Sequence, residues 1–231
     1  MANKMNDLDW ARIETVFLDM DGTLMDLAFD NYFWHEYVPL IYSKSREINF
    51  LQAKSELLAK YKSKRGSLNW YCTDYWSEQL DLNIVELKRD IVDRIVLFPL
   101  VTEFLRWLRN NNKRSVLLTN AHLDSVKIKM DKTGIENLFD RIISSHTYGH
   151  AKEADDFWPI LSEDENHSPE SSLLIDDNIA VLQAADRHGI EYLLSVGRPD
   201  KSLPEQDTQH FVGINGFDEI VDKNELMNKI N

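Results

Sequence analysis

The sequence predicts an α/β fold in which a doubly wound parallel sheet carries an inserted helical cap. Five short apolar runs recur along the chain, and they lack the polar alternation of a half-exposed strand. Helical patterns lie between these runs, whereas one long interval after the first run contains helical patterns alone. The chain has 231 residues, of which 43% are hydrophobic, so it can bury a core of this kind.

The apolar runs are the predicted strands, because burial on both faces of a parallel sheet removes polar alternation. They are TVFLD at 15–19, SVLLT at 115–119, RIISS at 141–145, SLLID at 172–176 and EYLLSV at 191–196. A polar loop follows Arg198, and a further short strand is expected beyond it in HFVGI at 210–214.

Helices are predicted between the strands, in PLVTEFLRWLRNN at 99–111, LDSVKIKMDKTG at 123–134 and IAVLQAADRHG at 179–189. The last two patterns end on Gly134 and Gly189, and glycine is favoured just after a helix. A closing helix is predicted in FDEIVDKNELMNKI at 217–230.

The interval from about Asp30 to Arg94 has helical stretches but no strand-like run. INFLQAKSELLAKYKSK at 48–64 and NWYCTDYWSEQL at 69–80 are its clearest patterns. A helical cap subdomain is therefore predicted over 29–94, inserted after the first strand, while 1–28 and 95–231 form the core.

Composition excludes several classes of protein. A formal charge of -13 argues against a nucleic-acid polymer as partner, because such affinity comes mainly from Lys and Arg. Cys72 is the only cysteine, so no internal disulfide forms, and a reducing cytoplasm is expected. The polar start MANKMNDLDWARIE lacks the apolar segment of an export signal, and no run approaches the roughly 18 apolar residues of a membrane helix.

Two carboxylates follow the first predicted strand, in Asp19-Met20-Asp21-Gly22-Thr23. Glycine permits a tight turn there, so both carboxylates can point into the crevice at the carboxyl ends of the strands, where open α/β sheets bind ligands. Alone, such a segment is as readily an Asp-Gly turn.

Polar residues at the ends of other predicted strands, or in the loops after them, favour a functional site. These are Thr119-Asn120, Lys152 and Asp176-Asp177. Each has an ordinary explanation by itself: a strand-end hydroxyl, a solvated lysine and a helix cap. Their coincidence at one edge of one sheet favours a shared chemical role.

The ordered set resembles the four signature motifs of the haloacid dehalogenase-like (HAD) phosphotransferases, and it spans residues 19 to 177. The resemblance implies a Rossmann-like core, a mobile cap, a bound Mg²⁺ and a phospho-aspartate intermediate. It makes Asp19 the nucleophile, and Asp21 the acid that protonates the leaving oxygen and the base that then activates water. Haloacid dehalogenases lack the second carboxylate, so Asp21 favours phosphoryl transfer.

The remaining motif residues acquire roles by the same resemblance. Mg²⁺ is expected on Asp19, on the main-chain carbonyl of Asp21 and on Asp177, with Asp176 in support. The phosphoryl oxygens are expected to be bound by Lys152, Thr119 and Asn120. Ala151 is a departure, since proline commonly precedes the motif lysine.

Longer stretches look like those of the bacterial GMP/IMP nucleotidase group: FLDMDGTLMDLAFDNYFW, LNWYCTDYWSEQL, LLTNAH and LLIDDN. This likeness implies purine nucleoside 5'-monophosphates with a 6-oxo base as substrates. Trp70, Tyr71 and Tyr75 could stack on the base. The helical spacing of Tyr71 and Tyr75 fits the core of the cap at least as well.

Two other functions stay open at this point. One is a sugar phosphatase or a β-phosphoglucomutase-like phosphotransferase, since one core serves many substrates. The other is a non-catalytic binding protein on the same fold. Histidines are not needed for the expected chemistry, and only His122 is near enough to the motifs in sequence to reach the crevice.

Overall fold

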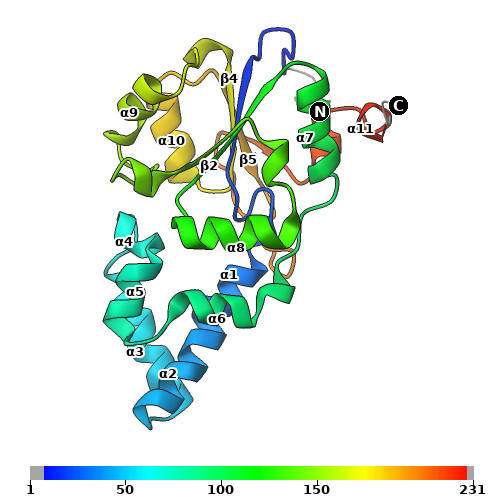
Figure 1. Cartoon of the computed structure of the whole chain (residues 1–231). Coiled ribbons are helices and arrows are strands. Elements are labelled where there is room, and N and C mark those ends of the chain that lie inside the picture. Colours follow the sequence, from blue (N-terminus) through cyan, green and yellow to red (C-terminus); the bar gives the residue numbers. More distant parts are fainter. Residues whose placement is uncertain (1–7, 228–231) are drawn as a thin grey trace.

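The computed structural model describes residues 8–227, and its centre is a six-stranded sheet in the order β3-β2-β1-β4-β5-β6. Every neighbouring pair is parallel. The strands are β1 (Thr15–Leu18), β2 (Arg114–Thr119), β3 (Arg141–Ser144), β4 (Ser172–Asp176), β5 (Tyr192–Val196) and β6 (Val212–Ile214). The predicted α/β class with a parallel sheet is confirmed (Figure 1).

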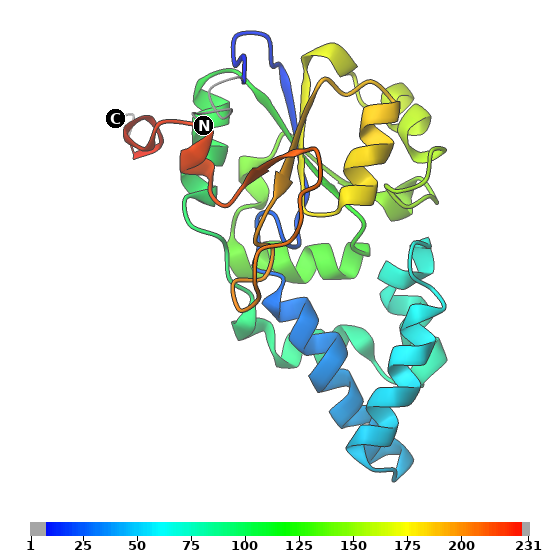
Figure 2. The ribbon, with the colours of Figure 1, turned by 180° about the vertical axis from the view of Figure 1, so that it is seen from behind.

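Helices cover both faces of this sheet, which explains why the strand sequences show no polar alternation. One face carries α7 (Val101–Asn110), α8 (Leu123–Thr133) and α11 (Lys223–Met227), and the other carries α9 (Phe157–Asp164) and α10 (Ile179–Arg187) (Figure 2). Along β1, Val16 and Leu18 pack into the cluster on the α7 face, and Phe17 packs into the cluster on the α10 face.

Residues 28–94 are helical and gather beyond one end of the sheet (Figure 1). The helices are α1 (Ala28–Tyr32), a π-helical turn (Phe33–Tyr37), α2 (Val38–Arg46), α3 (Phe50–Lys62), α4 (Leu68–Tyr71), α5 (Thr73–Leu80), α6 (Ile84–Asp90) and a 3₁₀ turn (Val92–Arg94). They share a hydrophobic cluster of their own, around Phe33, Leu57 and Trp76. The exact split into a core of 1–28 and 95–231 and a cap of 29–94 stays a prediction.

Two predicted helices differ from those observed. The stretch 69–80 is broken at Cys72, whose extended backbone (φ -84°, ψ 114°) ends α4 and whose sulfur accepts from the Tyr75 amide at the start of α5. The predicted closing helix is a 3₁₀ turn (Phe217–Glu219) followed by α11, because the Asp222 carboxylate accepts from the Asn224 amide and starts a new helix. Its end, 228–230, lies outside the described residues, as do residues 1–7 of the polar start.

The order of the strands places a crevice at the carboxyl end of β1. The chain runs from β1 outward through β2 to β3, and then crosses back to β4 on the other side of β1. Connections leave in opposite directions on either side of this point, so the loops there diverge and leave room for a ligand. Among residues 8–227 no helix is both long and apolar enough to span a membrane.

Candidate active site

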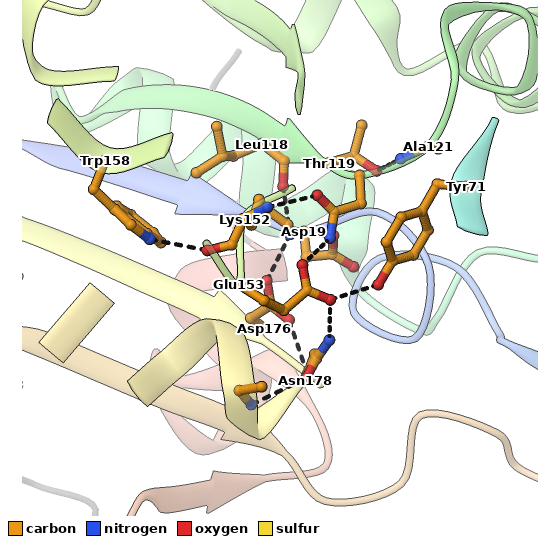
Figure 3. A network of polar contacts seen from close by, with 12 residues as sticks. Asp19, Tyr71, Leu118, Thr119, Ala121, Lys152, Glu153, Trp158, Asp176 and Asn178 are labelled. Carbon is orange, nitrogen blue, oxygen red and sulfur yellow. Dashed lines mark hydrogen bonds and ion pairs between the residues drawn. The ribbon is translucent and has the colours of Figure 1, made fainter. Parts of the chain in front are cut away.

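Asp19 follows β1 directly and lies in a buried ion cluster (Figure 3). The Lys152 ammonium donates to Asp19 Oδ1 at 2.6 Å, to Asp176 Oδ2 at 2.6 Å and to the Leu118 carbonyl at 2.9 Å. Burial raises the pKa of Asp19 to about 6, although Lys152 opposes the rise. Burial also acts to lower the pKa of Lys152, but the carboxylates of Asp176 and Asp19 outweigh it and hold that pKa above its usual value.

Asp19, Asp176 and Asp177 together form an oxygen-rich cluster that could bind a metal. Each offers a carboxylate oxygen, and these atoms all lie within 4.8 Å of one another. Burial and then the charges of Asp19 and Asp176 raise the pKa of Asp177 well above its usual value, and none of the residues from 8 to 227 forms an ion pair with it. Three crowded carboxylates with one lysine fit a hard divalent cation, which favours oxygen ligands and offsets their repulsion.

Gly22 makes the approach of Asp177 to this turn possible. Its φ is +89°, a conformation that side-chain-bearing residues rarely adopt, and a Cβ atom there would lie 2.6 Å from Asp177 Oδ2 and 2.9 Å from Pro199. The turn after β1 therefore accepts only glycine at this position.

Asp21 begins a buried chain of alternating charges that the sequence did not reveal. Its Oδ1 accepts from Lys129 Nζ at 2.5 Å, Lys129 also donates to Asp30 Oδ2 at 2.5 Å, and Lys88 donates to Asp30 Oδ1 at 2.9 Å. Lys129 is only 1% exposed and Lys88 only 3%. Burial raises the pKa of Asp21 to about 6 against the effect of Lys129. For Asp30 burial acts to raise the pKa, but the two lysines outweigh it and lower the pKa to about 2.

Thr119 ends β2, and Asn120, which follows it, holds the loop that carries Lys152. Asn120 Oδ1 accepts from the Lys152 amide at 2.9 Å, and the indole of Trp158 donates to the Lys152 carbonyl at 2.9 Å. The loop is thus held on both sides of Lys152, even though Ala151 replaces the proline expected there. Thr119 Oγ1 accepts from the Ala121 amide at 3.0 Å, and its own proton has no acceptor among residues 8–227, so it remains available to a ligand.

The Glu153 carboxylate accepts hydrogen bonds from both the core and the helical cap, and nothing in its sequence context singled it out. Its carboxylate accepts from Asn120 Nδ2 at 2.8 Å, from Asn178 Nδ2 at 3.0 Å and from the Tyr71 hydroxyl at 2.6 Å (Figure 3). Tyr71 belongs to α4, so this contact joins the cap to the residue that follows Lys152.

One cavity of about 640 Å³ connects these groups with the cap. The predicted motif residues all line it: Asp19, Asp21, Thr119, Asn120, Lys152, Asp176 and Asp177. Its other wall is formed by the cap side chains Trp34, His35, Tyr61, Arg65, Trp70, Tyr71 and Trp76. Its volume lies in the range usual for small-molecule sites, about 300–1,000 Å³.

Two residues considered from the sequence are not part of the cavity wall. Tyr75 packs against Trp76, with ring centroids 5.0 Å apart, and Lys64 lies over its ring. Tyr71 and Tyr75 do not share a helix face, because the break at Cys72 separates α4 from α5. His122 also lies outside the wall and instead contacts Thr73.

Comparison with known proteins gives a consistent result. A model of the haloacid dehalogenase-like hydrolases matches residues 13–189. The GMP/IMP nucleotidase YrfG of Escherichia coli is 38% identical over 215 residues, which cover 93% of this chain and 97% of that protein. The protein of the same name from Shigella flexneri matches to the same extent.

Solved structures support the fold. A HAD phosphatase from Thermococcus onnurineus superposes with a TM-score of 0.71 at 19% identity, covering 87% of this chain and 93% of that one. A putative β-phosphoglucomutase from Thermotoga maritima gives a TM-score of 0.62 at 17% identity, with 90% and 97% covered. At these identities the likeness concerns the fold alone, and it agrees with the α/β core described above.

Proposed function

Because the chain belongs to the haloacid dehalogenase-like hydrolases and is a phosphatase of that family, we propose that it is a 5'-nucleotidase acting on GMP and IMP. The products are the nucleoside and inorganic phosphate. The observation that carries the proposal is one continuous cavity, with buried carboxylates and Lys152 at one end and the aromatic side chains of the cap at the other. The similarity to the E. coli nucleotidase over 93% of the chain supports the same substrate class.

Asp19 is the proposed nucleophile. A carboxylate oxygen of Asp19 attacks phosphorus, the bond from phosphorus to the 5' oxygen breaks, and Asp21 gives that oxygen a proton. Asp21 then takes a proton from the water that attacks the acyl phosphate, which frees phosphate and restores Asp19. Lys152 already binds Asp19 at 2.6 Å, so its charge lies where the transferred oxygens arrive, next to Thr119 and Asn120.

The proposed metal is Mg²⁺, held by Asp19, Asp177 and the main-chain carbonyl of Asp21, with Asp176 in support. The clustering of carboxylate oxygens within 4.8 Å supports this assignment. When bound, Mg²⁺ supplies positive charge that offsets the repulsion between Asp19 and the phosphate.

Lys129 is proposed to position Asp21. It fixes Oδ1 of Asp21 at 2.5 Å, and since Oδ2 has no hydrogen-bond donor among residues 8–227, that oxygen is proposed to transfer the proton. A lysine in a helix usually reaches solvent, but Lys129 shares its buried face of α8 with Val126 and Met130. That spacing is the one signal in the sequence that could have revealed it.

The base is proposed to lie against the aromatic wall of the cap. Trp70 and Tyr71 line the cavity and offer rings for stacking, whereas Tyr75 does not, so it has no part in this proposal. Arg65 also lines the cavity, with its guanidinium 5.9 Å from the centre of the Trp70 ring. Guanidinium donors match the O6 and N7 acceptors of guanine and hypoxanthine, but adenine carries an amino donor at position 6, which favours GMP and IMP over AMP.

Phosphate release from a panel of substrates tests the proposal. The panel contains GMP, IMP, AMP, a pyrimidine monophosphate and several sugar phosphates, each assayed with Mg²⁺ and with EDTA. Metal-dependent release that is strongest for GMP and IMP is expected. Preference for a sugar phosphate would overturn the substrate while leaving the role of Asp19 intact. A β-phosphoglucomutase-like activity would need a sugar bisphosphate and would release no net phosphate.

A further inference from the structure

A second group of side chains that could bind a metal lies outside the cavity, at the junction of cap and core. It consists of Cys72, between α4 and α5; His122, at the start of α8; and His146, in the 3₁₀ turn after β3 (Ser145–Thr147). Each offers one ligand atom, and the three atoms lie within 4.8 Å of one another. All three residues are partly exposed.

Hydrogen bonding leaves part of this group unexplained. The Nε2 atom of His146 is buried and has no partner among residues 8–227. Its ring meets the ring of His122 edge to face, with centroids 4.9 Å apart.

The neighbours of His122 resemble the surroundings of a metal ligand. Its Nδ1 lies 2.8 Å from the Thr73 hydroxyl oxygen, and such contacts orient metal-ligating imidazoles. Two carboxylates lie beside the same ring, Asp124 at 3.3 Å and Asp74 at 3.6 Å.

We propose that Cys72, His122 and His146 bind a transition-metal ion of borderline softness, such as Zn²⁺ or Co²⁺, and that the ion ties the cap to the core. Thiolate and imidazole ligands suit these ions, whereas Mg²⁺ prefers oxygen. The site is therefore distinct in chemistry from the carboxylate cluster around Asp19.

An ion bound at this site affects turnover, because the site lies where the cap meets the core. Cys72 follows Tyr71, and His122 is two residues beyond Asn120. Tyr71 and Asn120 both donate to Glu153, so the cap and the core already meet at that carboxylate. An ion bound to Cys72 and His122 holds the same two segments together, which restrains any opening of the cap that substrate entry and product release require.

Cobalt spectroscopy tests the binding. Co²⁺ is added to the full-length protein in excess Mg²⁺, which occupies the oxygen site, and absorption from thiolate-to-cobalt charge transfer is recorded. Cys72 is the only cysteine, so any such band arises from it. A saturable band is expected at one Co²⁺ per chain, absent in Cys72→Ser and retained in Asp177→Asn. Serine keeps a capping oxygen at the start of α5, so this variant should fold.

His146→Gln separates the cluster from a lone thiol. It should weaken the Co²⁺ affinity at least about tenfold, as loss of a ligand requires. A wild-type protein without the band, or a His146→Gln variant with unchanged affinity, would overturn the site.

Turnover tests the restraint separately. Saturation with Zn²⁺ in excess Mg²⁺ should lower the kcat of the wild type for its best phosphate ester, and leave the kcat of Cys72→Ser unchanged. Equal inhibition of both would place the effect at the carboxylate cluster and refute the restraint. The absorption measurement needs no turnover, so it stands whether or not the nucleotidase proposal holds.

Discussion

Replacing Lys129 by methionine tests the least expected part of the site. Methionine fills a similar volume but removes the ammonium that donates at 2.5 Å to both Asp21 and Asp30. Asp30 keeps Lys88 at 2.9 Å, whereas Asp21 loses its only ion-pair partner among residues 8–227. The variant therefore leaves one buried carboxyl group, that of Asp21, without a cation.

The magnitude follows from this loss. Breaking a buried ion pair costs about 3–5 kcal/mol when the other charge stays unpaired. Asp21 limits the cost by taking a proton, because burial already raises its pKa to about 6. We expect the free energy of unfolding to fall by about 3 kcal/mol near pH 7. In the wild type Asp21 ionises near pH 6, and without Lys129 it ionises only at higher pH, so the deficit is smallest below about pH 6 and grows as the pH rises above that value.

Catalysis should suffer more than binding. A protonated Asp21 cannot accept a proton from water, so kcat should fall at least about 100-fold while KM changes little. Urea unfolding and steady-state phosphate release measure the two effects. Lys88→Met is the matched control, since it removes the other buried lysine but keeps the contact between Lys129 and Asp21. A folded Lys129→Met protein with the kcat of the wild type would refute the positioning role.

Three further predictions concern the same site. Asp177→Asn should raise the thermal stability of the metal-free protein above pH 5, because it removes a carboxylate whose pKa is raised by burial and by Asp19. The same variant should bind Mg²⁺ more weakly when binding is measured by calorimetry. An unchanged Mg²⁺ affinity would contradict the proposed role of Asp177 as a metal ligand. Gly22→Ala should abolish phosphate release and lower the free energy of unfolding by at least about 1 kcal/mol, since its Cβ atom would lie 2.6 Å from an Asp177 oxygen. Normal activity of this variant would disprove the close approach of Asp177 to residue 22. Tyr71→Phe removes the hydroxyl that donates to Glu153 at 2.6 Å. The variant should lose about 1 kcal/mol of unfolding free energy, and its kcat/KM for GMP should fall measurably. Full activity would show that this contact is dispensable.

The core of the fold could be predicted because local sequence determines it. The run TVFLD is apolar throughout since its side chains face two hydrophobic clusters, and it becomes β1. Asp19 follows β1 and Asp176 is the last residue of β4, and these two strands are neighbours, so their ends bring the two carboxylates together without further information. Parallel pairing converts positions far apart in the chain into one edge of the sheet.

The ion chain behind Asp21 could not be predicted in the same way. Lys129 and Asp30 are 99 residues apart, and Lys88 and Asp30 are 58 apart, so each contact depends on how the cap packs against α8. The orientation of Tyr75 was missed for a local reason, because the extended backbone of Cys72 breaks the expected helix. Tertiary packing and one backbone dihedral decided these features, and neither is visible in a pattern of residue types.

The most direct test of the account is the rate of phosphate release from GMP, with Mg²⁺ present, by the wild type and by Asp19→Asn. The substitution keeps the shape of a side chain that accepts from Lys152 but removes its charge and its nucleophilic oxygen. The account predicts a folded variant that is slower by at least about a thousandfold. Release near the wild-type rate would contradict the role of Asp19, and with it the proposed mechanism.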